Sequence, residues 1–106
     1  GELVMLELVE GDNEICIVGE YKAIELMAFE SKLHACLTGL RIAKDVNLTQ
    51  VVGSDSGLIA LLLSFQRFAN EKHWQVKLIN ASDGVKGLLE LSQLSDFFTL
   101  IDEGKS

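Results

Sequence analysis

The chain has few basic residues, no proline and only two cysteines. Its nine Lys and Arg residues stand against sixteen Asp and Glu residues, which gives a formal charge of −7 at pH 7. Proteins that bind nucleic acids through their phosphates need clustered Lys and Arg side chains. The sequence contains no such cluster and no interleaving of basic with aromatic residues. This charge balance argues against nucleic acid as the main partner.

Long apolar runs are also missing. The longest run, 58–63, is far shorter than the roughly 20 residues that a membrane helix needs. The N-terminus lacks the basic-then-apolar layout of a secretion signal. We therefore expect a cytoplasmic protein that is not inserted into a membrane. In such a chain two isolated cysteines, Cys16 and Cys36, are expected to be reduced core residues rather than a disulfide.

The residues that are present suffice for a single domain spanning residues 1–106. Hydrophobic residues make up 48% of the chain, as in ordinary globular proteins. The spacing of apolar residues predicts the order strand, strand, helix, strand, helix, strand, helix, strand. The expected ranges are 3–9, 15–18, 22–40, 42–52, 58–70, 74–80, a helix capped by residues 80–83 that continues to Leu91, and 97–101, followed by a frayed tail at 102–106. A hairpin followed by strand–helix–strand crossovers indicates an α/β fold with a mixed sheet.

The most informative stretch is Gly53-Ser54-Asp55-Ser56-Gly57, called the polar cluster below. It separates an alternating strand from a long apolar helix. Such a turn presents hydroxyls and unpaired backbone N–H groups at a helix N-terminus. Negative charge is favourable there, whether on a carboxylate or on a phosphorylated serine. The cluster either caps the helix alone or contacts a partner as well.

In this order of elements the chain resembles the STAS domain family, which includes bacterial anti-sigma factor antagonists and cytoplasmic modules of some transporters. Segment 47–63 is similar to the family's strand, Asp-Ser-Ser/Thr-Gly-Leu motif and apolar helix. Segment 76–98 is similar to a later strand, a capped helix with a Leu-Glu-Leu-like step and a short loop into the last strand. The resemblance implies a STAS-like mixed β-sheet with helices packed against it.

The polar cluster departs from the family's motif order, which is Asp, phosphoacceptor Ser or Thr, small residue, Gly. Counted back from Gly57 without a gap, Asp55 takes the acceptor position and Ser54 the Asp position. Ser56 then takes the small-residue position, and Asp55 is a fixed charge that partly imitates a phosphate. If one residue was lost before Asp55, Ser56 is the acceptor instead. The ungapped alignment keeps the helix register and is preferred, but the sequence leaves both open.

No catalytic, metal or cofactor site is indicated. A Ser nucleophile needs a nearby base, and neither His34 nor His73 has a sequence context that points to the polar cluster. His34 and Cys36 are two residues apart on a helix, so they lie on different faces. No second Cys/His group is present to complete a metal site. A small metabolic or nucleotide-binding enzyme is the least favoured class.

The resemblance therefore implies a non-enzymatic protein-interaction module. The first hypothesis is an anti-sigma factor antagonist that binds an anti-sigma factor or kinase-like regulator. Its recognition residues would be Ser54, Asp55, Ser56 and Gly57. The alternative is a STAS subunit of a bacterial lipid-transport ABC system, which binds the ATPase.

A loose acidic set near the hairpin is either a solvated face or a docking surface for a basic partner: Glu7, Glu10, Asp12, Glu14 and Glu20.

Overall fold

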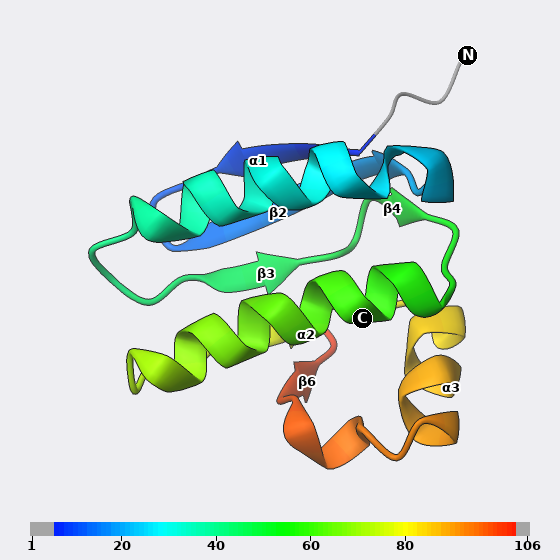
Figure 1. Cartoon of the computed structure of the whole chain (residues 1–106). Coiled ribbons are helices and arrows are strands. Elements are labelled where there is room, and N and C mark those ends of the chain that lie inside the picture. Colours follow the sequence, from blue (N-terminus) through cyan, green and yellow to red (C-terminus); the bar gives the residue numbers. More distant parts are fainter. Residues whose placement is uncertain (1–5, 104–106) are drawn as a thin grey trace.

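The computed structural model describes residues 6–103 and shows a mixed sheet with three α-helices (Figure 1). The strands are β1 Glu7–Glu10, β2 Glu14–Glu20, β3 Asp45–Asn47, β4 Val51–Val52, β5 Leu78–Ile79 and β6 Leu100–Ile101. The α-helices are α1 Leu26–Thr38, α2 Ser56–Glu71 and α3 Asp83–Leu91, and two 3-10 turns are η1 Ala23–Glu25 and η2 Ser95–Phe97. The parts of the expected first strand at 3–5 and of the expected tail at 104–106 lie outside the described residues.

The sheet has the order β1-β2-β3-β5-β6, and β4 pairs with β2 beyond the end of β3. The predicted hairpin is confirmed, because β1 and β2 pair antiparallel and the Gly11 N–H donates to the Glu14 carbonyl at 2.8 Å. All other strand pairs are parallel. This arrangement is the mixed sheet that the sequence predicts.

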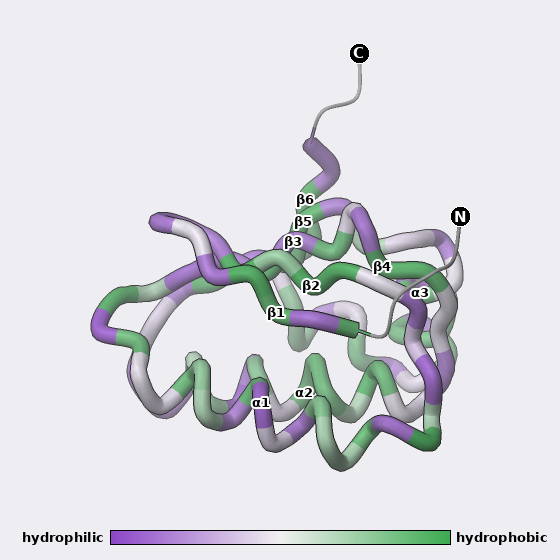
Figure 2. The backbone as a smooth tube through the Cα atoms, turned by 90° about the horizontal axis from the view of Figure 1, so that it is seen from above, coloured by the Kyte–Doolittle hydropathy of each residue, from purple (hydrophilic) through white to green (hydrophobic). Residues whose placement is uncertain are grey.

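Helices α1 and α2 lie side by side on one face of the sheet (Figures 1 and 2). The burial pattern of β2 alternates, and Ile15 and Ile17 point into the core between sheet and helices. Each helix buries an apolar stripe at helical spacing: Phe29, Leu33 and Leu37 from α1, and Leu58, Ile59, Leu61, Leu62, Phe65 and Ala69 from α2. Within residues 6–103, no helix has the length and apolarity needed to cross a membrane.

The expected single strand at 42–52 is wrong, since the chain forms two short strands there. The Asn47 side-chain oxygen accepts a hydrogen bond from the Thr49 N–H at 2.9 Å, and the Val51 N–H donates to the Leu48 carbonyl at 3.1 Å. Asn commonly forms such local turns because its side chain imitates a backbone acceptor. The turn interrupts the ladder, so β3 and β4 pair with different parts of β2.

The later strands are also shorter than predicted, and the first two helices have different limits. β5 begins only at Leu78, because the Lys77 N–H donates to the Asp45 carboxylate at 2.9 Å. The expected last strand begins at residue 97, but residues 95–97 form a 3-10 turn. β6 itself is two residues long. α1 starts after η1, at Leu26, and α2 starts at Ser56, two residues earlier than expected.

A buried lysine joins the hairpin to the segment before β3. The Lys44 ammonium donates to the Glu10 carboxylate at 2.6 Å and to the Gly11 carbonyl at 2.7 Å, and the residue is only 8% exposed. The hydrogen bond from Lys44, and then its charge, lower the pKa of Glu10. The two cysteines carry free thiols, as expected, but both are half-buried and not fully buried core residues; the Cys36 thiol contacts the same Glu10 carboxylate.

A lowered pKa makes the Glu10–Lys44 contribution to stability depend on pH. Because the folded pKa of Glu10 is below its ordinary value of 4.5, the contribution is present above that value and lost as pH falls through the folded pKa. We expect Glu10→Gln to have a lower urea midpoint than wild type at pH 7. The difference between the two midpoints should become smaller as the pH is lowered towards 3. Glu7→Gln, exposed on the same strand, is the control. A pH-independent difference would contradict the expectation.

Candidate functional site

The polar cluster lies where β4 leaves the sheet and α2 begins (Figure 1). Gly53 has φ of 89°, a left-handed conformation that glycine adopts without strain. This turn lets the chain change direction within three residues between Val52 and Ser56. The predicted strand-to-helix position of the cluster is confirmed.

Asp55 is the N-cap of α2. One oxygen of its carboxylate accepts hydrogen bonds from the N–H groups of Gly57 at 2.7 Å and Leu58 at 3.3 Å. These N–H groups have no partner inside the helix, and a negative charge beside them is favoured by the helix dipole. The cap explains why α2 begins at Ser56, ahead of the apolar run from which its start was predicted.

The two serines of the cluster have different surroundings. Ser56, the first residue of α2, is exposed. Ser54 is half-buried and packs on the first turn of α3, where a Cβ on Gly84 would lie 2.7 Å from the Ser54 hydroxyl oxygen. Gly84 therefore leaves the space that Ser54 occupies. This contact brings the N-termini of α2 and α3 together, which the sequence alone did not indicate.

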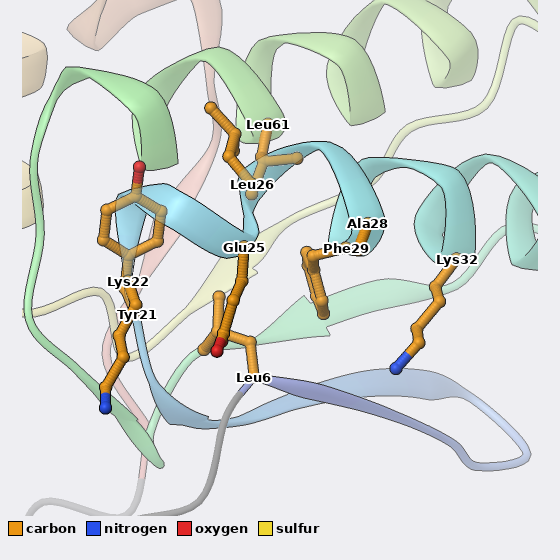
Figure 3. Close-up of a pocket in the computed structure, with 9 residues that line it drawn as sticks. All are labelled: Leu6, Tyr21, Lys22, Glu25, Leu26, Ala28, Phe29, Lys32 and Leu61. Atoms are coloured by element: carbon orange, nitrogen blue, oxygen red, sulfur yellow. The ribbon is translucent and has the colours of Figure 1, made fainter.

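Tyr21 is a further residue of this site, and no pattern in the sequence indicates it. It follows β2, and its N–H donates to the Val52 carbonyl at 2.8 Å, just before the cluster. Its ring directs the hydroxyl towards the start of α2 (Figure 3). A Cβ on Gly57 would overlap this hydroxyl, so only glycine fits there without a shift. No sequence signal links Tyr21 to a motif more than thirty residues away; the pairing of β2 with β4 does so.

The Tyr21 hydroxyl is buried and lies close to the Asp55 carboxylate, but within residues 6–103 it makes no hydrogen bond of full geometry. Burial, and then the neighbouring Asp55 carboxylate, raise the pKa of the Tyr21 phenol. Beside the ring lies a small cavity of about 70 Å³, lined mainly by the apolar side chains of Leu6, Leu26, Phe29 and Leu61 (Figure 3). The cavity is too small for a drug-sized ligand, but it leaves the Tyr21 ring loosely packed on that side.

Three members of the acidic set near the hairpin have partners within the chain. Glu10 binds Lys44, the Glu14 carboxylate accepts from the Asn47 amide at 3.3 Å, and Glu20 lies 3.7 Å from the Lys22 ammonium. These contacts join neighbouring strands and loops. They give part of the acidic set a structural role.

Comparison with known proteins shows the fold. No protein-family model matches the chain, and no curated protein matches its sequence. The anti-sigma factor antagonist SpoIIAA in its unphosphorylated form shares the fold with a TM-score of 0.73 at 19% identity, over 94% of this chain and 89% of that one. A putative anti-sigma factor antagonist from Thermotoga maritima aligns with a TM-score of 0.77 at 14% identity, over 93% and 87%.

A STAS-domain anti-sigma-factor antagonist protein from Planctomyces limnophilus aligns with a TM-score of 0.69 at 15% identity, over 93% of this chain and 91% of that one. The chain therefore has the STAS fold, as the resemblance in its sequence predicts.

The charge of Asp55 can be tested through Tyr21, the only tyrosine of the chain. Because the Asp55 carboxylate disfavours the phenolate, Asp55→Asn should lower the pKa of Tyr21, while burial keeps it above the ordinary value. Near-ultraviolet absorbance follows the ionisation of the Tyr21 phenol as pH rises. Circular dichroism at each pH shows over which range the protein is still folded, and only that range is used. Glu71→Gln, at the other end of α2, should leave the pKa of Tyr21 unchanged. An equal pKa in Asp55→Asn and wild type would refute the proximity of the two groups.

The close packing at Gly57 gives a second expectation. Gly57→Ala places a methyl group against the Tyr21 hydroxyl and should lower the free energy of unfolding by about 1–3 kcal/mol. Tyr21→Phe in the same chain should restore part of this loss. Gly87→Ala in α3 is the matched control, because no atom lies within 4 Å of the added Cβ and alanine favours helix. Urea denaturation gives the free energy of unfolding of wild type, Gly57→Ala, Gly57→Ala with Tyr21→Phe, and Gly87→Ala. If Tyr21→Phe restores none of the lost stability, a neighbour other than the Tyr21 hydroxyl causes the strain.

Proposed function

We propose that this chain is a non-enzymatic regulatory module that binds a protein partner through the polar cluster and the exposed face of α2. The observation that carries the proposal is the exposed Ser56 next to the capping carboxylate of Asp55, on the STAS fold. Solved proteins with this fold are described as anti-sigma factor antagonists. An anti-sigma factor or kinase-like regulator is therefore the proposed partner.

Ser56 is the proposed phosphoacceptor, which follows the alignment with one residue lost before Asp55 and not the ungapped one. Its side chain is exposed, whereas Ser54 is half-buried against Gly84. A phosphate on Ser56 would carry a charge of about −1.5 to −2 at the positive end of α2. Asp55 already supplies one fixed charge there, so phosphorylation would add to an existing negative charge. The added charge would change the affinity of the first turn of α2 for the proposed partner.

A catalytic role is not part of the proposal. His73 lies beyond the C-terminal end of α2, whereas the polar cluster is at its N-terminal end. His34 is in the middle of α1, where it lines a groove with Met27 and Phe68. Neither histidine is among the side chains that lie nearest to Gly53 and Gly57. In residues 6–103, no group of three or more His, Cys, Asp or Glu side chains is arranged to hold a metal ion.

Affinity capture from the source cells tests the proposal. We expect the tagged wild-type chain to retain a kinase-like protein, and Ser56→Glu to weaken capture about tenfold, equivalent to about 1.4 kcal/mol. Ser92→Glu, an exposed change at the end of α3, is the charge-matched control and should leave capture unchanged.

The identity of the captured protein separates the hypotheses. An ATPase of a lipid-transport system in place of the kinase would favour the alternative role as a transport subunit. Incubation of the purified chain with the captured kinase and ATP, followed by mass spectrometry, locates any phosphate. Loss of phosphorylation in Ser56→Ala but not in Ser54→Ala supports the assignment. A partner that binds wild type, Ser56→Glu and Ser92→Glu equally would place the interface away from the polar cluster and contradict the proposal.

A further inference from the structure

Two oxygen atoms of different hydrogen-bonding capacity lie beside Gly57. A Cβ built on Gly57 would lie 3.1 Å from the Asp55 carboxylate oxygen and against the Tyr21 hydroxyl oxygen. Both atoms therefore approach the same point of the first turn of α2. The carboxylate can only accept hydrogen bonds, whereas the phenol hydroxyl can donate one.

In the structure, the Asp55 cap bonds to backbone N–H groups, while the Tyr21 hydroxyl lies close to the same carboxylate without reaching full hydrogen-bond geometry. One oxygen of Asp55 bonds to the N–H groups of Gly57 and Leu58, while the buried Tyr21 hydroxyl has no partner of full geometry within residues 6–103. A buried hydroxyl without a partner is unfavourable, and a bond to a charged acceptor is stronger than one to a neutral acceptor. The hydroxyl lies near the same point beside Gly57 as the Asp55 oxygen that already accepts two bonds, so a turn of the carboxylate that completes a bond to Tyr21 competes with the cap.

We propose that Tyr21 is a positioning residue for the polar cluster, whose hydroxyl offers the Asp55 carboxylate a second donor and so lets it alternate between capping α2 and binding Tyr21. The proposal rests on the proposed function, because the alternation regulates the same site. When Asp55 turns to Tyr21, the N–H groups of Gly57 and Leu58 are released next to the exposed Ser56. A phosphate on Ser56 or an acceptor group of the partner then takes these N–H groups.

The surroundings allow this alternation. Gly57 carries no side chain that would separate Tyr21 from Asp55, and the cavity beside Leu26 and Leu61 gives the ring room to adjust. The backbone of Tyr21 is held to Val52 by the β2–β4 pairing, so the hydroxyl stays within reach of the cluster (Figure 3). The raised pKa of Tyr21 agrees with a carboxylate close to the phenol.

The chain contains a matched cap for comparison. At the start of α3, the Ser82 hydroxyl accepts from the Val85 N–H at 3.2 Å. Ser82 and Asp55 have the same role, but the Tyr21 hydroxyl lies beside the Asp55 cap, whereas the nearest side chains at Gly84 in the Ser82-capped turn are Ser54 and Ser82. A change that acts through Tyr21 should therefore affect the Gly57 and Leu58 amides and leave the Val85 amide unchanged.

Amide hydrogen exchange of the purified full chain tests the proposal without any partner. In Tyr21→Phe the carboxylate has no alternative donor, so exchange at Gly57 and Leu58 should slow three- to tenfold relative to wild type, measured by nitrogen-15 NMR. Asp55→Asn should speed exchange at the same amides. Urea denaturation is run in parallel, because a purely structural role of Tyr21 would change exchange across all of α2 in step with global stability.

Unchanged or faster exchange at Gly57 and Leu58 in Tyr21→Phe would overturn the proposal, as would an equal change at Val85. Capture from the source cells is then repeated with Tyr21→Phe, which should bind three- to tenfold less partner than wild type. If Ser56→Glu weakens capture but Tyr21→Phe changes neither exchange nor capture, the inference fails and the proposed function stands. If exchange changes as expected but the wild-type chain captures no partner, the alternation stands and the proposed function fails.

Discussion

The hydrogen bonds from the Gly57 and Leu58 N–H groups to the Asp55 carboxylate determine where α2 begins. Since α2 contributes the largest apolar stripe of the core, its starting point also sets which residues face the sheet. Leu58 is fully buried directly after the cap, while Ser56, two residues earlier, points to solvent. The same carboxylate that anchors the helix thus determines which hydroxyl of the polar cluster is exposed to solvent.

Three separate parts of the chain meet at the polar cluster. The end of β2 contributes Tyr21, the turn after β4 contributes the cluster itself, and the first turn of α3 contributes Gly84. Two of these contacts depend on glycine, because a side chain at Gly57 or Gly84 would collide with an oxygen atom. A site built this way links the charge at one helix start to the packing of two other elements. Such linkage is what the proposed partner-binding role of the polar cluster would need.

Much of the fold could be predicted from the spacing of apolar residues. The hairpin, the three helices and the mixed sheet follow from alternating and helical patterns that are local in the sequence. The lengths of the strands could not be predicted this way, because side-chain oxygens compete with backbone carbonyls for the backbone N–H groups. Asn47 binds the Thr49 N–H and Asp45 binds the Lys77 N–H, which shortens strands that the pattern alone extends. Lys44 was equally unforeseen, since its burial depends on the hairpin carboxylate of Glu10.

The sequence by itself determined the fold class, the position of the polar cluster between strand and helix, and the presence of capping residues in that cluster. These features depend on residues close together in the chain, where spacing and side-chain type are sufficient. Only the tertiary structure decided that Ser56 is exposed, that Ser54 packs on Gly84, and that Tyr21 belongs to the site. Those contacts are made between elements that the sheet brings together, and their distances arise from packing that no local pattern encodes.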